Sequence, residues 1–191
     1  MWIYIFIIID LTLIALHFIY GKSADFFNLA CENNLPTLYQ SIKTLITGSL
    51  LIVIARKYKL NTWILVAGII VVYFAFDDWF QIHEKISNYI YLNTFFEMRY
   101  RWIIVYLPIL TLAVIAFRKI YYKIKMNRLI ILGLALLILA FCLEIVEALT
   151  YSSQYIFYQV TAEESLEMLG MTAILVAVWG KLKLNFTKNS F

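Results

Sequence analysis

The chain has 191 residues, of which 63% are hydrophobic and only 15% are charged. This apolar share is well above that of a soluble domain, and the formal net charge is only +4, so nothing in the composition supports nucleic-acid binding. We therefore predict one integral membrane domain over residues 1–191, with short loops and tails.

Apolar segments of about 20 residues, the length that an α-helix needs to cross a hydrocarbon core, recur along the chain. They predict an all-α, polytopic membrane helix bundle with about six transmembrane helices, at residues 2–20, 39–57, 62–82, 102–119, 128–150 and 162–180. The first segment has no basic region before it and no clear cleavage site, so we expect a retained helix. Residues 21–36 form the one loop long enough to have structure of its own.

Basic residues gather in three segments, which follow the second, fourth and sixth predicted spans. With six spans, these three segments lie on one side of the membrane, and the positive-inside rule then predicts that both termini are cytoplasmic. The residues concerned are Arg56, Lys57, Lys59, Arg118, Lys119, Lys123, Lys125, Arg128, Lys181, Lys183 and Lys188.

Polar side chains on all six spans fall at a similar depth, a little below the outer boundary. Walking each helix at 1.5 Å per residue puts them about 18–27 Å from its cytoplasmic end. We expect the acids and histidines of this layer to be neighbours, with Lys43 and Arg101 as their charge partners. Asp10 lies deeper and is isolated from the layer, and a proton relay, a helix contact and a neutral buried acid are all open for it.

The third span ends in the motif DDxxxxHE, which comprises Asp77, Asp78, His83 and Glu84. On a regular helix, His83 lies about 100° outside the arc that Asp77 and Glu84 share, so it should contact a different neighbour. Acids at the C-terminal end of a helix oppose its dipole and need water, a cation or a basic side chain as a partner. A hydrated helix end with ion pairs is the alternative to a functional site.

Two further groups of acids lie on the fifth and sixth spans. Glu144 and Glu147 share one helix face, with no basic residue within a turn. The sixth span opens with Thr161 and Glu164, the pattern of a capping box that would start a helix there. Glu167 lies one turn deeper, on a face with Gly170, where a small residue permits close helix approach.

The aromatic residues near the outer boundary, including Trp102 and Tyr106, are typical of an interfacial belt. The two cysteines, Cys31 in the first loop and Cys142 in the fifth span, are not brought together by any sequence pattern. A disulfide between them therefore stays open.

Carboxylates and imidazoles together suit Zn, Mn or Fe more than Ca or Mg, which prefer oxygen ligands alone. The sequence contains neither H-E-x-x-H nor the Glu-x-x-His pairs of di-iron bundles, so the metal hypothesis depends on clustering. We assign no catalytic residue and no other cofactor. The candidate metal or cation ligands are His17, Asp77, Asp78, His83, Glu84, Glu144, Glu147, Glu164 and Glu167.

The DDxxxxHE segment, Asp77 to Glu84, together with the later EExxExxG segment, Glu163 to Gly170, resembles small uncharacterised multi-pass membrane proteins of bacteria. The resemblance implies that the two motifs form one site, and it brings no activity with it. Separately, we expect a multi-pass protein of the bacterial cytoplasmic membrane.

Three functions remain open at this point. The layer could be a metal site that activates water against a lipid or lipid-linked substrate, the outer vestibule of a proton- or cation-coupled carrier, or a network that stabilises a scaffold, sensor or partner subunit. A carrier should show broken helices, and the sequence has no Gly/Pro-interrupted pair of spans. Membrane lipids, a second copy of the chain and another membrane subunit are the expected partners.

Overall fold

The structure is a computed structural model, and it describes residues 2–21, 23–29, 31, 34–58, 62–89, 102–123, 128–150 and 156–188. All regular structure within these residues is helical, as predicted. The elements are α1 (Trp2–Tyr20), the short 3₁₀-helix η1 (Asp25–Phe27), α2 (Leu35–Lys57), α3 (Thr62–Phe80), α4 (Ile82–Tyr89), α5 (Trp102–Lys123), α6 (Arg128–Thr150) and α7 (Ile156–Lys188).

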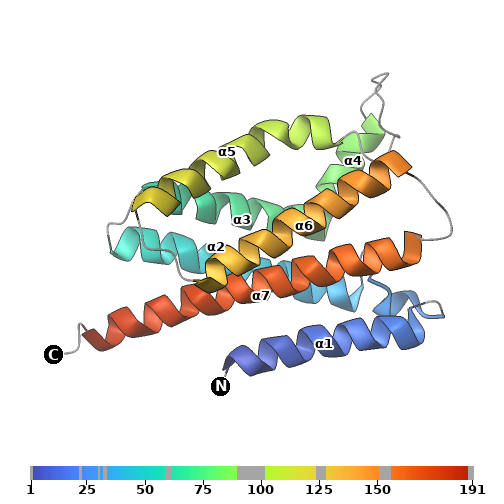
Figure 1. The fold of residues 1–191 in the computed structure, drawn as a ribbon, viewed down its shortest axis with the longest axis horizontal. Helices are drawn as coiled ribbons and strands as arrows, with labels where there is room; N and C mark the ends of the chain where they lie inside the picture. Colours follow the sequence, from blue (N-terminus) through green and yellow to red (C-terminus); the bar gives the residue numbers. More distant parts are fainter. Residues whose placement is uncertain are drawn as a thin grey trace.

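The long helices lie side by side along one common direction (Figure 1). The most extensive contacts join α2 to α3 and α6 to α7, while α7 also touches α1 and α2, and α3 touches α5. The start of α1 and the end of α7 lie toward one end of the bundle, and α4 lies at the other end (Figure 1). We call the end with α4 the outer end and the opposite end the inner end.

Two helices begin earlier than predicted. The side chain of Asn34 caps α2, since it accepts a hydrogen bond from the backbone N–H of Thr37 (3.0 Å), and the helix starts at Leu35. Pro36 does not prevent this, because proline is tolerated in the first turn of a helix. The predicted capping box at Thr161 is wrong, since α7 already begins at Ile156. Thr161 lies inside α7, and its hydroxyl bonds back to the carbonyl of Phe157.

In the part of the chain that the structure describes, three helical segments are long and apolar enough to cross a membrane: Leu35–Lys57, Thr62–Phe80 and Arg128–Val146. A shorter apolar helix covers Tyr4–Tyr20. This is fewer than the six predicted spans. In α7, the physical reason is that Glu163, Glu164 and Glu167 interrupt the apolar sequence.

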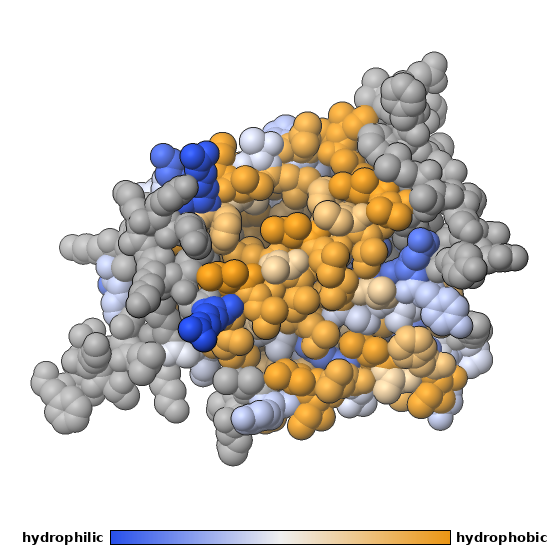
Figure 2. Space-filling model, in the orientation of Figure 1, coloured by the Kyte–Doolittle hydropathy of each residue, from blue (hydrophilic) through white to orange (hydrophobic). Residues whose placement is uncertain are grey.

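Apolar side chains cover much of the surface. Ile8, Val114 and Ile138 are each more than 60% exposed, and the face drawn in Figure 2 is apolar across its middle, with hydrophilic patches toward both ends. A surface of this kind suits a lipid environment.

Glycines allow two helix pairs to approach closely. A Cβ on Gly170 of α7 would lie 2.9 Å from the carbonyl oxygen of Gly133 in α6, so no larger residue fits at this crossing. This confirms the prediction that Gly170 permits close approach. Gly48 of α2 and Gly68 of α3 meet in the same way.

Candidate functional site

The third predicted span breaks before its end. Gln81 has a φ of 52°, in the left-handed region that a non-glycine residue rarely adopts, and it separates α3 from α4. The carboxylate of Asp77 caps the new helix, because its Oδ1 accepts a hydrogen bond from the backbone N–H of His83 (2.9 Å). On the other side of the break, the Lys85 ammonium donates to the carbonyl of Phe80 at the end of α3 (2.7 Å).

The break overturns the prediction that His83 faces away from Asp77. That prediction assumed a regular helix, whereas the turn at Gln81 carries His83 back over the end of α3. Its Nδ1 lies 3.2 Å from Oδ2 of Asp77. Since a carboxylate only accepts hydrogen bonds, this contact assigns the proton to Nδ1. Nε2 is then the ring nitrogen that does not face Asp77.

Asp77 is also bonded from α5. The hydroxyl of Tyr106 donates to Oδ1 of Asp77 (2.6 Å), and the hydroxyl of Tyr73 donates to Tyr106 (2.9 Å). Trp102 packs edge-on against both Tyr106 and the His83 ring. Asp77 therefore accepts from three donors, two on His83 and one on Tyr106, and it orients the imidazole.

The prediction that Trp102 and Tyr106 belong to an interfacial belt is wrong, because both are buried. A local signal for this network exists in the sequence. Tyr73 precedes Asp77 by four residues, and Trp102 precedes Tyr106 by the same spacing, so each pair shares a helix face.

Beside the Asp77–His83 pair lies a group of acids from three helices, which we call the carboxylate cluster: Asp78, Glu144, Glu163, Glu164 and Glu167. The other four carboxylates all interact electrostatically with Glu164, and Glu167 interacts with the His83 imidazole. All five side chains are half-buried. The structure thus brings together residues of both sequence motifs with one from α6.

Glu84 and Glu147 lie on α4 and α6, but their side chains fall outside the described residues, as does Arg101. Among the described residues, no three His, Cys, Asp or Glu side chains are already arranged around one point as metal ligands.

Lys43, expected to compensate the outer acids, pairs with Asp10 instead. Its ammonium donates to Oδ1 of Asp10 (2.9 Å) and to the carbonyl of Met168 (2.8 Å), and Thr172 donates to Oδ2 of Asp10 (2.6 Å). Asp10 and Lys43 are 0% and 1% exposed. Asp10 therefore takes part in a buried ion pair that joins α1, α2 and α7, and we call this contact the inner link because it lies in the interior of the bundle.

His17 makes a second connection between α1 and α7. The backbone N–H of Leu29 donates to its Nδ1 (3.0 Å), so Nε2 bears the proton and donates to the hydroxyl of Thr161 (2.7 Å). The ring also stacks on Phe157, with centroids 4.6 Å apart. Both nitrogens are engaged, so the structure places His17 in a contact between α1, the first loop and α7.

Cys31 and Cys142 are both free thiols. The Cys31 thiol lies in the first loop beside Asn28 and Asp25. Burial and the neighbouring Asp25 carboxylate raise the pKa of this thiol above its usual range.

No curated protein and no solved structure matches the chain. A family model described as Domain of unknown function (DUF8692) matches residues 3–180. Since this match covers nearly the whole helical bundle, the chain belongs to that family.

Proposed function

We propose that the chain is an integral protein of a bacterial cytoplasmic membrane and that its carboxylate cluster binds a cation at the outer end of the bundle. The observation that carries the proposal is the electrostatic contact of Glu164 with four other carboxylates. Several carboxylates in a low-dielectric setting repel one another unless a proton or a cation neutralises part of their charge.

The apolar surface and the three helices of membrane-crossing length support the membrane part of this proposal. In the proposed topology, the six long helices all cross and both termini are cytoplasmic. The basic residues near the inner ends of α2, α5 and α6 support this orientation by the positive-inside rule: Arg56, Lys57, Arg118, Lys119 and Arg128.

The available donor atoms favour Zn, Mn or Fe over Ca or Mg. Carboxylate oxygens surround Glu164, and the imidazole of His83 lies within electrostatic reach of Glu167. In protein metal sites, a ligating histidine commonly donates its other ring nitrogen to a carboxylate, which fixes the ring and its tautomer. Asp77 makes this contact with His83. We assign Nε2 of His83, Glu164 and Glu167 to the cation and Asp77 to the positioning of His83.

The test is metal content by plasma mass spectrometry on detergent-purified protein, together with thermal unfolding after incubation with Zn, Mn, Fe(II), Ca or Mg. We expect near-stoichiometric metal, or a rise in the unfolding temperature with one of these ions, in the wild type. Glu164→Gln and Glu167→Gln should lose the bound metal and the rise in unfolding temperature. Asp25→Asn, which neutralises an exposed acid outside the cluster, should keep both. A folded wild type that neither contains nor responds to any of these ions would overturn the proposal.

The role of Asp77 can be separated from that of the ligands. Loss of the partner that orients a metal-binding histidine typically weakens metal affinity by about 10–100-fold, without abolishing binding. We expect Asp77→Asn to show such a loss and His83→Ala to bind still more weakly. Equal metal affinity in the wild type and in Asp77→Asn would show that Asp77 does not position His83 for metal binding.

Ion-coupled transport is a second candidate, favoured by the break at Gln81. Interrupted membrane helices are a common way for transporters to form ion sites, and this break places Asp77 and His83 beside the carboxylate cluster. In proteoliposomes with an internal pH-sensitive dye, a carrier should show proton flux when a cation gradient is applied, and Glu167→Gln should lose it. Flux equal to that of protein-free vesicles would exclude this candidate.

A further inference from the structure

We propose that the outer part of the α2–α3 pair binds one glycerophospholipid. Its acyl chain occupies an apolar groove, an ester carbonyl accepts a hydrogen bond from Ser41, and its phosphate contacts Lys85. The inference goes beyond the proposed cation site and uses none of its residues.

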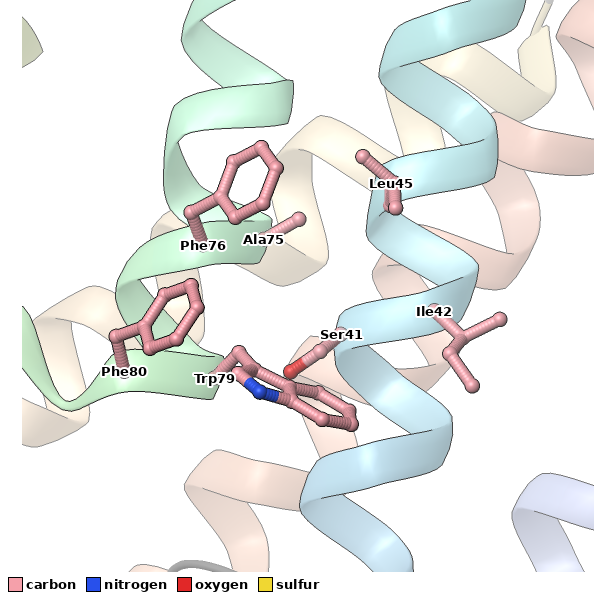
Figure 3. A pocket seen from close by; sticks show the side chains of 7 residues that line it. All are labelled: Ser41, Ile42, Leu45, Ala75, Phe76, Trp79 and Phe80. Carbon is pink, nitrogen blue, oxygen red and sulfur yellow. The ribbon is translucent and has the colours of Figure 1, made fainter.

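The groove has a volume of about 280 Å³ and opens between two of the helices that are long enough to cross a membrane. Four of its side chains, Ile42, Phe76, Trp79 and Phe80, are about half exposed, so in a membrane they meet lipid. Figure 3 shows the seven lining residues, three from α2 and four from α3: Ser41, Ile42, Leu45, Ala75, Phe76, Trp79 and Phe80.

Ser41 is the polar member of this lining. Its side chain is buried, yet its hydroxyl has no hydrogen-bond partner among the described residues. A helical serine or threonine commonly bonds to the carbonyl four residues earlier, as Thr12, Thr47, Thr111 and Ser165 do in this chain. In Figure 3 the Ser41 hydroxyl is directed toward Trp79, into the groove.

An unbonded hydroxyl in an apolar setting costs free energy, so a ligand that supplies an acceptor is favoured over a plain hydrocarbon chain. Ser41 lies six residues after the start of α2, about 9 Å from the outer end of that helix. The ester carbonyls of a glycerophospholipid lie near this boundary between the headgroups and the acyl chains. They are the acceptors that we assign to Ser41.

One cation lies at the end of α3, next to the groove residue Phe80. The exposed Lys85 of α4 donates to the carbonyl of Phe80, itself a groove residue, and this bond holds the ammonium above the end of α3. An ammonium has three N–H donors, so one bond to Phe80 leaves donors for a phosphate oxygen. Lys85, Trp79 and Ser41 therefore supply an ammonium, an indole and a hydroxyl near the apolar surface of the groove, which suit the phosphate, the interface and the ester of a phospholipid.

The groove and the carboxylate cluster lie on different faces of α3. At 100° per residue, the four groove residues of α3 centre about 130° from both Asp77 and Asp78. Substitutions in the groove therefore test lipid binding without altering the acids, and each proposal can fail alone.

The experiment is native mass spectrometry of delipidated protein after addition of phosphatidylglycerol. The wild type should retain one lipid per chain. Leu45→Trp fills the groove and should reduce the bound fraction about tenfold, whereas Val53→Trp, at an exposed position of the same helix outside the groove, should not. Equal retention in these two variants would overturn the proposal.

Two milder variants test the polar contacts and keep the experiment informative if the tryptophan variants fold poorly. Ser41→Ala should reduce retention about fivefold, as expected for one hydrogen bond. Lys85→Gln should reduce it about threefold, as expected for an exposed ion pair, and Lys119→Gln serves as its control. Unchanged lipid retention in both variants would contradict the roles of Ser41 and Lys85. A wild-type dimer that forms without lipid and that Leu45→Trp dissociates would also contradict the proposal, because a second copy of the chain would then occupy the groove.

Discussion

The inner link and the carboxylate cluster are both polar networks inside an apolar bundle, but their charges are balanced differently. In the inner link, one ammonium meets one carboxylate, and the carboxylate also accepts from Thr172. In the carboxylate cluster, the four groups that act on Glu164 are themselves acids. A buried pair of opposite charges is complete within the protein, whereas a group of like charges favours a proton or a cation from outside.

The difference extends to solvent access. Asp10, Lys43 and Thr172 are almost fully buried, so nothing can bind between them without displacing a protein contact. The acids of the carboxylate cluster are half-buried at the outer end of the bundle. The inner link therefore has the properties of a structural contact, and the carboxylate cluster is the place where we propose a bound cation.

The largest effect is expected in the inner link. Lys43→Met leaves the Asp10 carboxylate buried without its cation, which should destabilise the fold by about 3–5 kcal/mol. Thermal unfolding in detergent measures this loss. The double variant Asp10→Leu with Lys43→Met removes both charges and should recover much of the stability. If the double variant is less stable than Lys43→Met alone, the two charges do not form the link described above.

A smaller effect is expected at the helix break. Asp77→Ala removes the carboxylate that caps α4 and accepts from Tyr106 and His83, and loss of such a cap should cost about 1–2 kcal/mol. Hydrogen exchange should show faster exchange in the backbone amides of α4, with little change in α1. Tyr106→Phe removes one of the three bonds and should have a similar but weaker effect. Unchanged exchange in α4 would show that the cap does not stabilise it.

In the carboxylate cluster, a substitution should stabilise the fold and not destabilise it. Without added cation, Glu164→Gln removes repulsion from neighbouring acids and should stabilise the protein by roughly 1 kcal/mol. With a saturating cation, the wild type should gain more stability than the variant. Unfolding temperatures with chelator and with metal test this crossover. Destabilisation of Glu164→Gln in chelator would mean that the acids are already compensated as in the inner link.

The smallest effect is expected in the alkylation rate of Cys31, in the first loop. This rate also tests which side of the membrane the outer end of the bundle faces. Because the pKa of this thiol is raised, the reactive thiolate should be scarce at neutral pH and should increase only as the pH passes above the usual thiol range. A membrane-impermeant alkylating reagent, applied to intact cells expressing the Cys142→Ala variant, should label Cys31 slowly at neutral pH. Asp25→Asn removes one cause of the raised pKa and should increase the rate severalfold. Labelling only after cell lysis would reverse the proposed orientation.

Much of the architecture could be predicted from local sequence. The six predicted spans each coincide with a long helix, because apolar length and the lack of helix breakers are properties of short segments. The layer itself stays a prediction, which follows from the distance of each residue along its own helix. The electrostatic interactions of Glu164 with Asp78, Glu144 and Glu167 join acids that the sequence puts at similar distances along their helices.

The partners within that layer depended on the tertiary structure. Gln81 is neither glycine nor proline, so the sequence contains no ordinary signal for the break that turns His83 toward Asp77. Lys43 and Asp10 are 33 residues apart, and Thr172 and Asp10 are 162 residues apart. The sequence determined which charges enter the bundle and at what depth, because both depend on each helix alone. Only the packing of the helices against one another decided that Lys43 pairs with Asp10 and that acids from α3, α6 and α7 interact at the outer end.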